Sequence, residues 1–121
     1  MTHKVNLDEY FEKFRDTFAP KIVGELNGQH VKLVRCEGDK IPWHTHDEED
    51  EMFFVVDGVL DILERDGTTT LHSGEFSIVH KGVEHRIVPR GHVKLMLFEP
   101  AGISHTGNVR TEITKDRLDR L

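Results

Sequence analysis

The pattern of apolar and polar positions divides the chain into three stretches, and the first reads as a helix. Five apolar side chains recur there at the spacing of one helix face: Leu7, Tyr10, Phe11, Phe14 and Phe18. Asn6 can cap the helix start, with Glu9 three residues later, and Pro20 ends the segment. We expect an amphipathic helix over residues 6–18, whose aromatic face packs against the domain or a partner subunit.

The second stretch, residues 21–100, changes to a period of two, with turn signals at short intervals. The turn signals are Asn27-Gly28, Gly38-Asp39, Asp57-Gly58, Asp66-Gly67, Ser73-Gly74, Lys81-Gly82 and Arg90-Gly91. The strand-like runs between them are residues 30–36, 51–56, 59–64, 69–72, 76–79, 86–88 and 93–98. Many short strands with regular turns predict an antiparallel sandwich or barrel. No helix of 10–15 residues separates the strands, which disfavours a parallel α/β sheet.

The third stretch, residues 101–121, is polar. We expect it to end in a short helix around residues 115–121, or to lie extended on the surface or on a partner. The whole chain of 121 residues has the length of a single domain. The expected organisation is therefore one domain over residues 1–121, with a core at about 21–100 between the N-terminal helix and this tail.

Composition and charge exclude several classes of protein. Sixteen basic and 22 acidic residues give a net charge of −6, which disfavours general binding to nucleic acid. No run approaches the length of a membrane span, and the opening residues MTHKVNLDEYF lack the apolar stretch of a signal peptide. The lone cysteine, Cys36, reads as a small core residue and points to the reducing cytoplasm.

Three of the nine histidines and one glutamate stand out by position: His44, His46, His85 and Glu51. His44 and His46 are two residues apart, so on one strand they face the same way. Imidazole and carboxylate are ligands of divalent transition metals, and four such groups leave positions open for water or substrate. The competing interpretation is surface histidines beside a solvated acidic loop at residues 47–50.

The spacing of these residues favours the metal interpretation and carries a family resemblance. Residues 38–58 read Gly, five residues, His, one residue, His, four residues, Glu, six residues, Gly. This resembles the first motif of the cupin superfamily. The second cupin motif is matched at Gly74, Gly82 and His85, whereas His80 stands where the family has proline and Pro89 where it has asparagine.

The resemblance to small single-domain cupins covers residues 30–100 and implies both a fold and a site. The implied fold is all-β, a cupin-type jelly-roll β-barrel with a short N-terminal helix. It implies that His44, His46, Glu51 and His85 converge on one divalent metal, which could be iron, manganese, nickel, cobalt, zinc or copper. His80 is the candidate catalytic residue, as an acid/base in the pocket, a hydrogen-bond donor to a metal ligand or an alternative ligand, although a plain turn residue at the pocket mouth fits as well.

Other polar residues are secondary candidates. His105 could border the pocket, and Lys81, Arg86 and Arg90 could meet an anionic substrate, although strand parity points Arg86 away from the barrel interior. The remaining histidines fall at strand ends, turns or the terminus and are expected to be exposed: His3, His30, His72 and His92.

Fold and ligand set do not fix the reaction, so two functions remain open. The first is a small metal-dependent enzyme, of isomerase or oxygenase type, acting on a polar small molecule that chelates the metal. The second is a non-catalytic module that binds or senses a sugar or small acid in the same barrel. A metal-free epimerase would need a catalytic His/Tyr pair, and the only tyrosine, Tyr10, lies in the expected helix. Open sheet edges and the aromatic helix face predict a homodimer.

Overall fold

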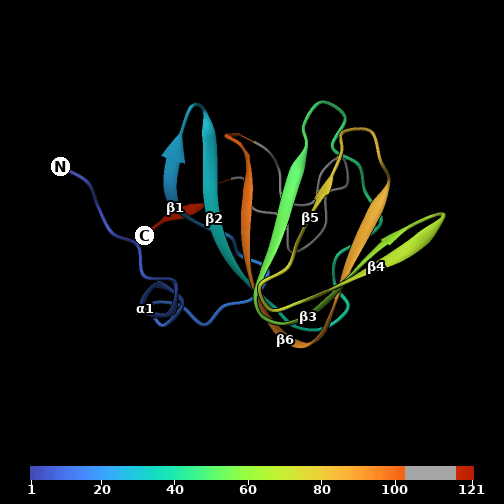
Figure 1. Cartoon of the computed structure of the whole chain (residues 1–121), viewed down its shortest axis with the longest axis horizontal. Coiled ribbons are helices and arrows are strands. Elements are labelled where there is room, and N and C mark those ends of the chain that lie inside the picture. The colour runs from blue at the N-terminus through green and yellow to red at the C-terminus, as the bar shows by residue number, and fades with distance from the viewer. Residues whose placement is uncertain (103–116) are drawn as a thin grey trace.

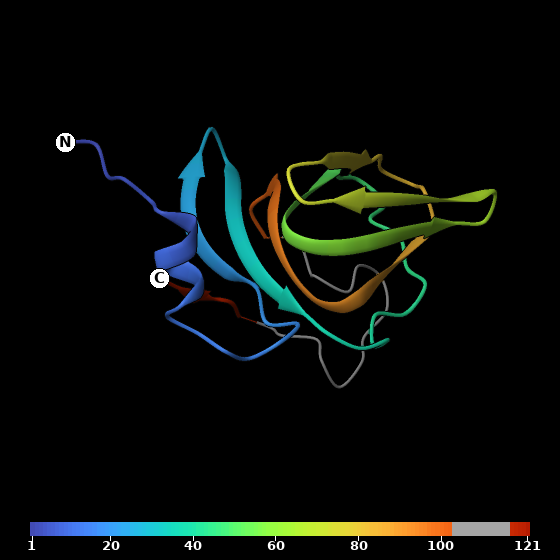
Figure 2. The same cartoon turned by 60° about the horizontal axis from the view of Figure 1, so that its bottom comes forward.

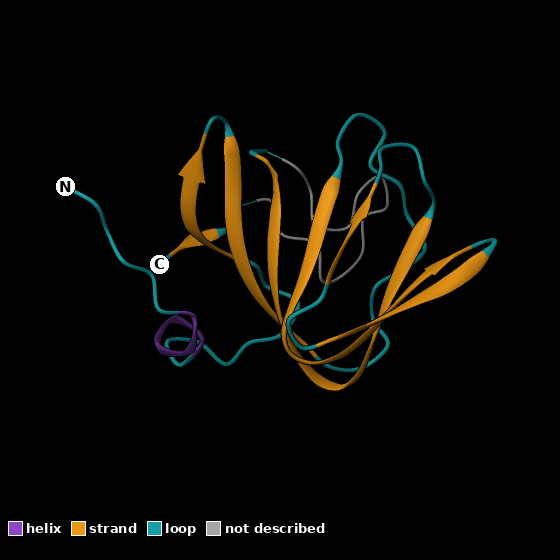
Figure 3. Ribbon diagram, in the orientation of Figure 1, coloured by secondary structure: helices purple, strands orange, loops and turns teal. Residues whose placement is uncertain are grey.

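The computed structural model describes residues 1–102 and 117–121, and nearly all of its regular structure is β-sheet. The elements follow one another as α1 (Leu7–Phe11), β1 (Lys21–Leu26), β2 (Gln29–Cys36), β3 (Glu51–Glu64), β4 (Gly67–His72), β5 (Phe76–Val79), β6 (His85–Pro100) and β7 (Asp119–Arg120). The strands curl into the expected jelly-roll barrel, with α1 on its outside (Figures 1 and 3). No helix in the described part of the chain is long and apolar enough to cross a bilayer.

Two long strands, β3 and β6, form the centre of the sheet. The strand order is β4-β3-β6-β2-β1-β7, and β5 adds to β3 beside β4. The first part of β3 pairs with β5 and its second part with β4, while β6 runs antiparallel to β3 and also pairs with β2. Because both long strands bend through the molecule, their halves lie on opposite walls of the barrel (Figure 2).

These long strands each contain a glycine step that we expected to be a turn. The Asp57-Gly58 step is a bulge, at which the register with β6 shifts, and β3 continues through it. Gly58 has φ 103°, and a Cβ there would lie 2.8 Å from the carbonyl oxygen of His92. Gly91 likewise lies inside β6 with φ 70°. The expected strands 51–56 and 59–64 are therefore one strand, as are 86–88 and 93–98, because a bulge bends a strand without ending it.

The helix is shorter than the expected range of residues 6–18. Asn6 caps it as predicted, accepting the Glu9 N–H at 3.0 Å, but α1 ends at Phe11. Arg35 on β2 donates to the carbonyl groups at and after the end of the helix, from Nε to Phe14 O at 3.0 Å and from Nη2 to Phe11 O at 2.8 Å. A buried guanidinium therefore satisfies carbonyls that a longer helix would have bonded internally.

The aromatic stripe consequently divides between two sides of the sheet. Phe11 and Phe14 pack on the outer face with Leu33, which confirms packing against the chain's own domain. Phe18 instead has φ 53° and joins the core inside the barrel. That core comprises Phe18, Val34, Cys36, Ile41, Phe53, Val55, Leu60, Ile62, Leu71, Val79, Ile87, Val93, Leu95 and Leu97.

The described end of the tail is extended rather than helical. Asp119 and Arg120 form β7, which pairs in parallel with Lys21 and Ile22 of β1. The Lys21 ammonium lies 3.1 Å from the Asp119 carboxylate, which ties this strand to the sheet. Of the two alternatives for the tail, residues 119–120 follow the extended one.

Candidate metal centre

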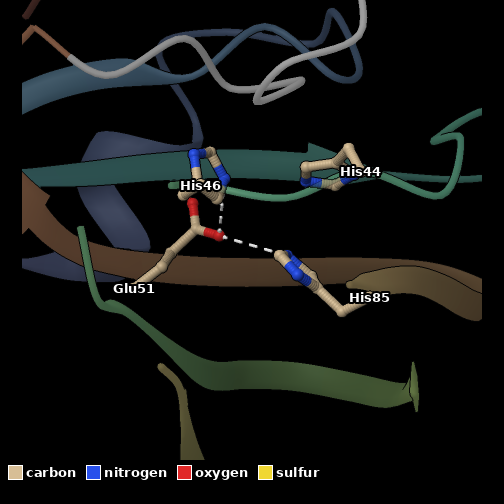
Figure 4. Close-up of side chains that lie close together, drawn as sticks. All are labelled: His44, His46, Glu51 and His85. Carbon is tan, nitrogen blue, oxygen red and sulfur yellow. Dashed lines mark ion pairs between the residues drawn. The ribbon is translucent and has the colours of Figure 1, made fainter. Parts of the chain in front are cut away.

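The four candidate ligands come from three separate places in the chain, and their side chains lie close together (Figure 4). Glu51 is the first residue of β3, and His85 is the first residue of β6. His44 and His46 were expected on one strand but lie in the loop that follows β2. The loop is fixed to β6 because His44 and His85 exchange both backbone hydrogen bonds of an antiparallel bridge, each at 3.0 Å.

Their side chains form a compact, buried cluster. One ligand atom from each of the four residues lies within 4.8 Å of the corresponding atoms of the other three. Glu51 Oε1 is 3.3 Å from His46 Nε2 and 3.7 Å from His85 Nε2 (Figure 4). All four residues are at most 5% exposed, so water has little access to them.

Backbone carbonyls set the orientation of two imidazole rings. His44 Nδ1 is 2.8 Å from the carbonyl oxygen of Pro42, and His85 Nδ1 is 3.0 Å from that of Val83. A carbonyl accepts only from an N–H, so each Nδ1 carries the proton and each Nε2 is left with a lone pair in the neutral ring. This is the arrangement in which a histidine presents Nε2 to a metal.

The donor atoms at the centre lack partners that the protein itself could provide. His46 Nε2, Glu51 Oε1 and His85 Nε2 are buried and form no hydrogen bond. Leaving a buried polar atom without a partner costs roughly 1–3 kcal/mol. A divalent transition metal would satisfy all three together, and three imidazoles with one carboxylate are donors that such metals accept. The residues present therefore fit a metal.

Burial and mutual contact shift the protonation of the cluster. Burial lowers the pKa of His44 to about 4, so this imidazole is neutral at pH 7. Burial opposes the ionisation of Glu51, but contact with the His46 and His85 rings outweighs it and holds the Glu51 pKa below its usual range. Burial also opposes a charge on His85, yet contact with the Glu51 carboxylate and the Val83 carbonyl raises the pKa of His85.

A small cavity of about 30 Å³ opens beside the cluster. His44 and Glu51 form its polar end. The rest of its lining is largely apolar: Phe18, Pro20, Val34, Cys36, Ile41, Phe53, Ile87, Leu95 and Leu97. Burial raises the pKa of the Cys36 thiol to about 12, which keeps it a neutral part of the wall, as expected for a small core residue. A metal here would face an apolar space on one side.

His80 does not join the cluster. Its side chain is 71% exposed, and its Nδ1 lies 3.5 Å from Asp50 Oδ1, which also accepts the Lys81 N–H at 2.9 Å. It does not line the cavity. The position matches the alternative of a turn residue beside the site, and the role as a proton carrier stays a prediction without geometric support.

The secondary candidates are also accounted for. His105 lies outside the described residues. Arg90 pairs with Asp61 on the surface, and Arg86 donates to the Ile41 carbonyl and pairs with Asp39, so neither lines the cavity. Lys81 is exposed, and so are His3, His72 and His92, as expected. The expectation for His30 was wrong: it is 7% exposed, with Nε2 2.6 Å from Glu25 Oε1.

Sequence reasoning missed two buried charged residues behind Glu51, namely Lys32 and Glu99. Lys32 Nζ donates to Glu99 Oε1 at 2.8 Å, and the two side chains are 1% and 0% exposed. The sequence does contain a signal for Glu99. It follows Val93, Leu95 and Leu97 at every second position of the same strand, so its side chain points to the same buried side.

Comparison with known proteins supports the fold assignment. The family model described as "Cupin domain" matches residues 36–100, which is more than half of the chain. The uncharacterized protein YdbB of Bacillus subtilis is 30% identical over 87 residues, which cover 71% of this chain and 76% of YdbB.

Two solved structures are similar over most of their length. A cupin-2 domain-containing protein from Shewanella frigidimarina shares 38% identity with a TM-score of 0.77, covering 79% of this chain and 93% of that one. Protein NMB1881 from Neisseria meningitidis shares 30% identity with a TM-score of 0.74, covering 82% of this chain and all of that one.

Proposed function

The chain belongs to the cupin family, and we propose that it is a small metal-dependent enzyme of isomerase or oxygenase type. His44, His46, Glu51 and His85 would hold one divalent transition metal. The observation that carries this proposal is the convergence of three buried donor atoms that have no hydrogen-bond partner. The donor set is compatible with iron, manganese, nickel, cobalt, zinc or copper.

The cavity beside the cluster supports a reaction on a small chelating molecule. A bound metal of this kind supplies Lewis-acid or redox chemistry to a substrate that chelates it. The apolar side chains of the cavity would exclude water from that substrate and pack against its non-polar part. Because roughly 10–15 Å³ is needed to hold one water molecule, the volume of about 30 Å³ limits the ligand to a very small chelating group at the His44 and Glu51 end.

Within this proposal, the lining of the cavity favours the oxygenase type over the isomerase type. Isomerisation by proton transfer needs a positioned base near the substrate. Among the residues that the structure describes, the titratable side chains that line the cavity are Cys36, His44 and Glu51. Two of these are proposed ligands, and the pKa of the third is raised to about 12. The exposed His80 does not reach the cavity to take that role.

Two further parts of the proposal concern the setting of the protein. We propose a cytoplasmic location, because the lone Cys36 is a buried free thiol. We also propose a homodimer, supported by an exposed apolar surface on β5, where Phe76 and Ile78 are 59% and 45% exposed. Among the described strands β5 pairs only with β3, which leaves its other edge open to a second copy.

The proposed activity can be tested with protein loaded with iron(II) or another single metal. Oxygen consumption is measured with a panel of compact chelators, such as 1,2-diketones, 2-hydroxy acids and thiol carboxylates. We expect turnover with at least one chelator, and its loss in His46→Ala. Product formed without oxygen uptake would indicate an isomerase. Binding of a ligand without any conversion would support the sensing or binding function instead.

A further inference from the structure

The wall of the barrel behind Glu51 contains a second layer of charged side chains. Glu99 is fully buried near the end of β6, and Lys32 is 1% exposed on β2. Lys32 Nζ donates to Glu99 Oε1 at 2.8 Å. Glu99 Oε2 is also buried and has no hydrogen-bond partner in the protein. This pair is therefore inside the barrel rather than on its surface.

The sheet register places this pair directly beside the candidate ligand. Met52 of β3 pairs with Phe98 of β6, so the next positions outward on these antiparallel strands are Glu51 and Glu99. Directly opposite residues of an antiparallel pair have Cβ atoms roughly 4.5–5.5 Å apart. Burial and the neighbouring Glu51 carboxyl group together raise the pKa of Glu99 well above its usual range. Lys32, Glu99 and Glu51 are thus successive neighbours, from β2 across β6 to β3.

Stability alone gives little reason for this arrangement. Two carboxyl groups opposite each other repel when both are charged, and burying an ion pair costs desolvation energy. Replacing such a buried pair with apolar residues of similar size is often neutral or stabilising. The surrounding inward positions of the same strands, Val34, Leu95 and Leu97, show that apolar side chains fit this interior. The polar chain therefore points to a role at the site that it contacts.

We propose that Glu99, anchored by Lys32, is a positioning residue that holds the Glu51 carboxylate in the orientation needed to bind the metal. This inference rests on the proposed function, since it assigns Glu99 a task only if Glu51 is a ligand. Glu51 Oε1 faces His46 and His85, and Glu99 lies opposite Glu51 on the neighbouring strand β6. Partners of this kind, which orient metal ligands, typically change metal affinity 10–100-fold when they are lost.

The test compares metal affinities, measured by competition with a chromogenic chelator, together with the visible absorption spectrum of the cobalt(II) form. The double variant Lys32→Met/Glu99→Met replaces the polar pair with apolar side chains of similar length. We expect cobalt(II) affinity to fall about 10–100-fold with a changed spectrum. Glu99→Gln keeps the shape, accepts from Lys32 and can donate to Glu51, so it should retain most of the affinity.

Two controls separate this role from general destabilisation. Lys21→Met removes another buried ammonium, one paired with Asp16 and Asp119 outside the site, and should leave cobalt(II) binding unchanged. If the double variant does not fold, the cobalt(II) affinity of Glu99→Asp tests the inference instead. Asp keeps the carboxyl group but places it farther from Glu51, so this variant should bind metal more weakly than Glu99→Gln. Equal affinities in these two single variants would overturn the inference.

The outcomes distinguish this inference from the proposed function. Metal binding that is lost in Glu51→Gln but unchanged in the folded double variant would leave the metal centre standing and overturn the role of Glu99. Wild-type protein that binds no metal would overturn both. Thermal unfolding of each variant shows whether the altered affinity arises in a folded protein.

Discussion

His44 and His85 donate their backbone N–H groups to each other's carbonyl oxygens, both at 3.0 Å. This bridge joins the loop after β2 to the first residue of β6, and thus links the two motifs that carry the candidate ligands. Since neither hydrogen bond involves a side chain, the bridge can form without metal. The backbone of the site is therefore built by the fold itself.

This relationship predicts protection of the two amides in metal-free protein. After treatment with chelator, the N–H groups of His44 and His85 should exchange with deuterium much more slowly than those of the exposed loop residues Asp47 and Glu48. Hydrogen exchange followed by NMR measures each amide separately. If the two histidine amides exchange as fast as those of the loop until metal is added, metal rather than the fold assembles the site.

The affinity for metal should rise with pH across the titration of His85. Its pKa lies above the usual 6.5, and the imidazolium must lose its proton before Nε2 can bind a metal. Log affinity should therefore increase by about one per pH unit below that pKa and level off above it. His44, with a pKa of about 4, adds nothing to this slope above about pH 5. Calorimetric titration of cobalt(II) from pH 5.5 to 8.5 measures the slope, and a flat profile would contradict the account.

The raised pKa of His85 has the opposite effect on the stability of the metal-free protein: its contribution to that stability should fall as pH rises. A histidine with a raised pKa stabilises the folded state fully below its unfolded value of 6.5, and this contribution is lost as pH rises through the folded value. Urea unfolding at several pH values, compared with His85→Gln, isolates this contribution. The wild-type advantage over the variant should shrink as pH increases. An advantage that grows over this range would contradict the direction of the shift.

Gly58 should not tolerate a side chain. It has φ 103°, and a Cβ would lie 2.8 Å from the carbonyl oxygen of His92, which is backbone and cannot easily move. Gly58→Ala should reduce the free energy of unfolding by about 1–3 kcal/mol or more. Gly67→Ala is the matched control, because nothing lies within 4 Å of its Cβ position. Denaturant unfolding of both variants tests the bulge, and equal stabilities would contradict the observed register shift in β3.

The exposed side chains of β5 make the homodimer testable. Phe76→Ser/Ile78→Ser should convert a dimer to a folded monomer in sedimentation velocity, because both side chains lie on the exposed side of that strand. Leu26→Ser removes a comparably exposed apolar side chain, 49% exposed, from the β1–β2 hairpin and should leave the dimer intact. Wild-type protein that sediments as a monomer would rule out the proposed dimer.

Much of the fold could be predicted from local patterns, and the errors have local causes. The strand at residues 76–79 was placed at its observed bounds, because alternation and turn signals coincide there. Gly58 and Gly91 were misread as turns, since sequence does not distinguish a glycine that bends a strand from one that ends it. The helix was overestimated because the aromatic spacing continues past Phe11, whereas Arg35, distant in sequence, takes the carbonyls.

The candidate site was likewise predicted only in part from the sequence. The spacing of the two motifs identified four residues that the structure brings together, although His44 and His46 lie in a loop instead of a shared strand. Glu99 and Lys32 were missed because lysine and glutamate side chains are almost never fully buried unless they are paired. Their connection to Glu51 depends on which strands are neighbours, and that order follows from the long-range pairing of β2, β6 and β3.

The central claim is that His44, His46, Glu51 and His85 bind one divalent transition metal, and metal analysis tests it most directly. Protein purified without chelator is analysed by inductively coupled plasma mass spectrometry, before and after loading with each candidate metal, beside Glu51→Gln and His46→Ala. The account predicts one divalent metal per wild-type chain and a large loss in both variants. Wild-type protein that contains no stoichiometric metal and cannot be loaded with one would contradict it.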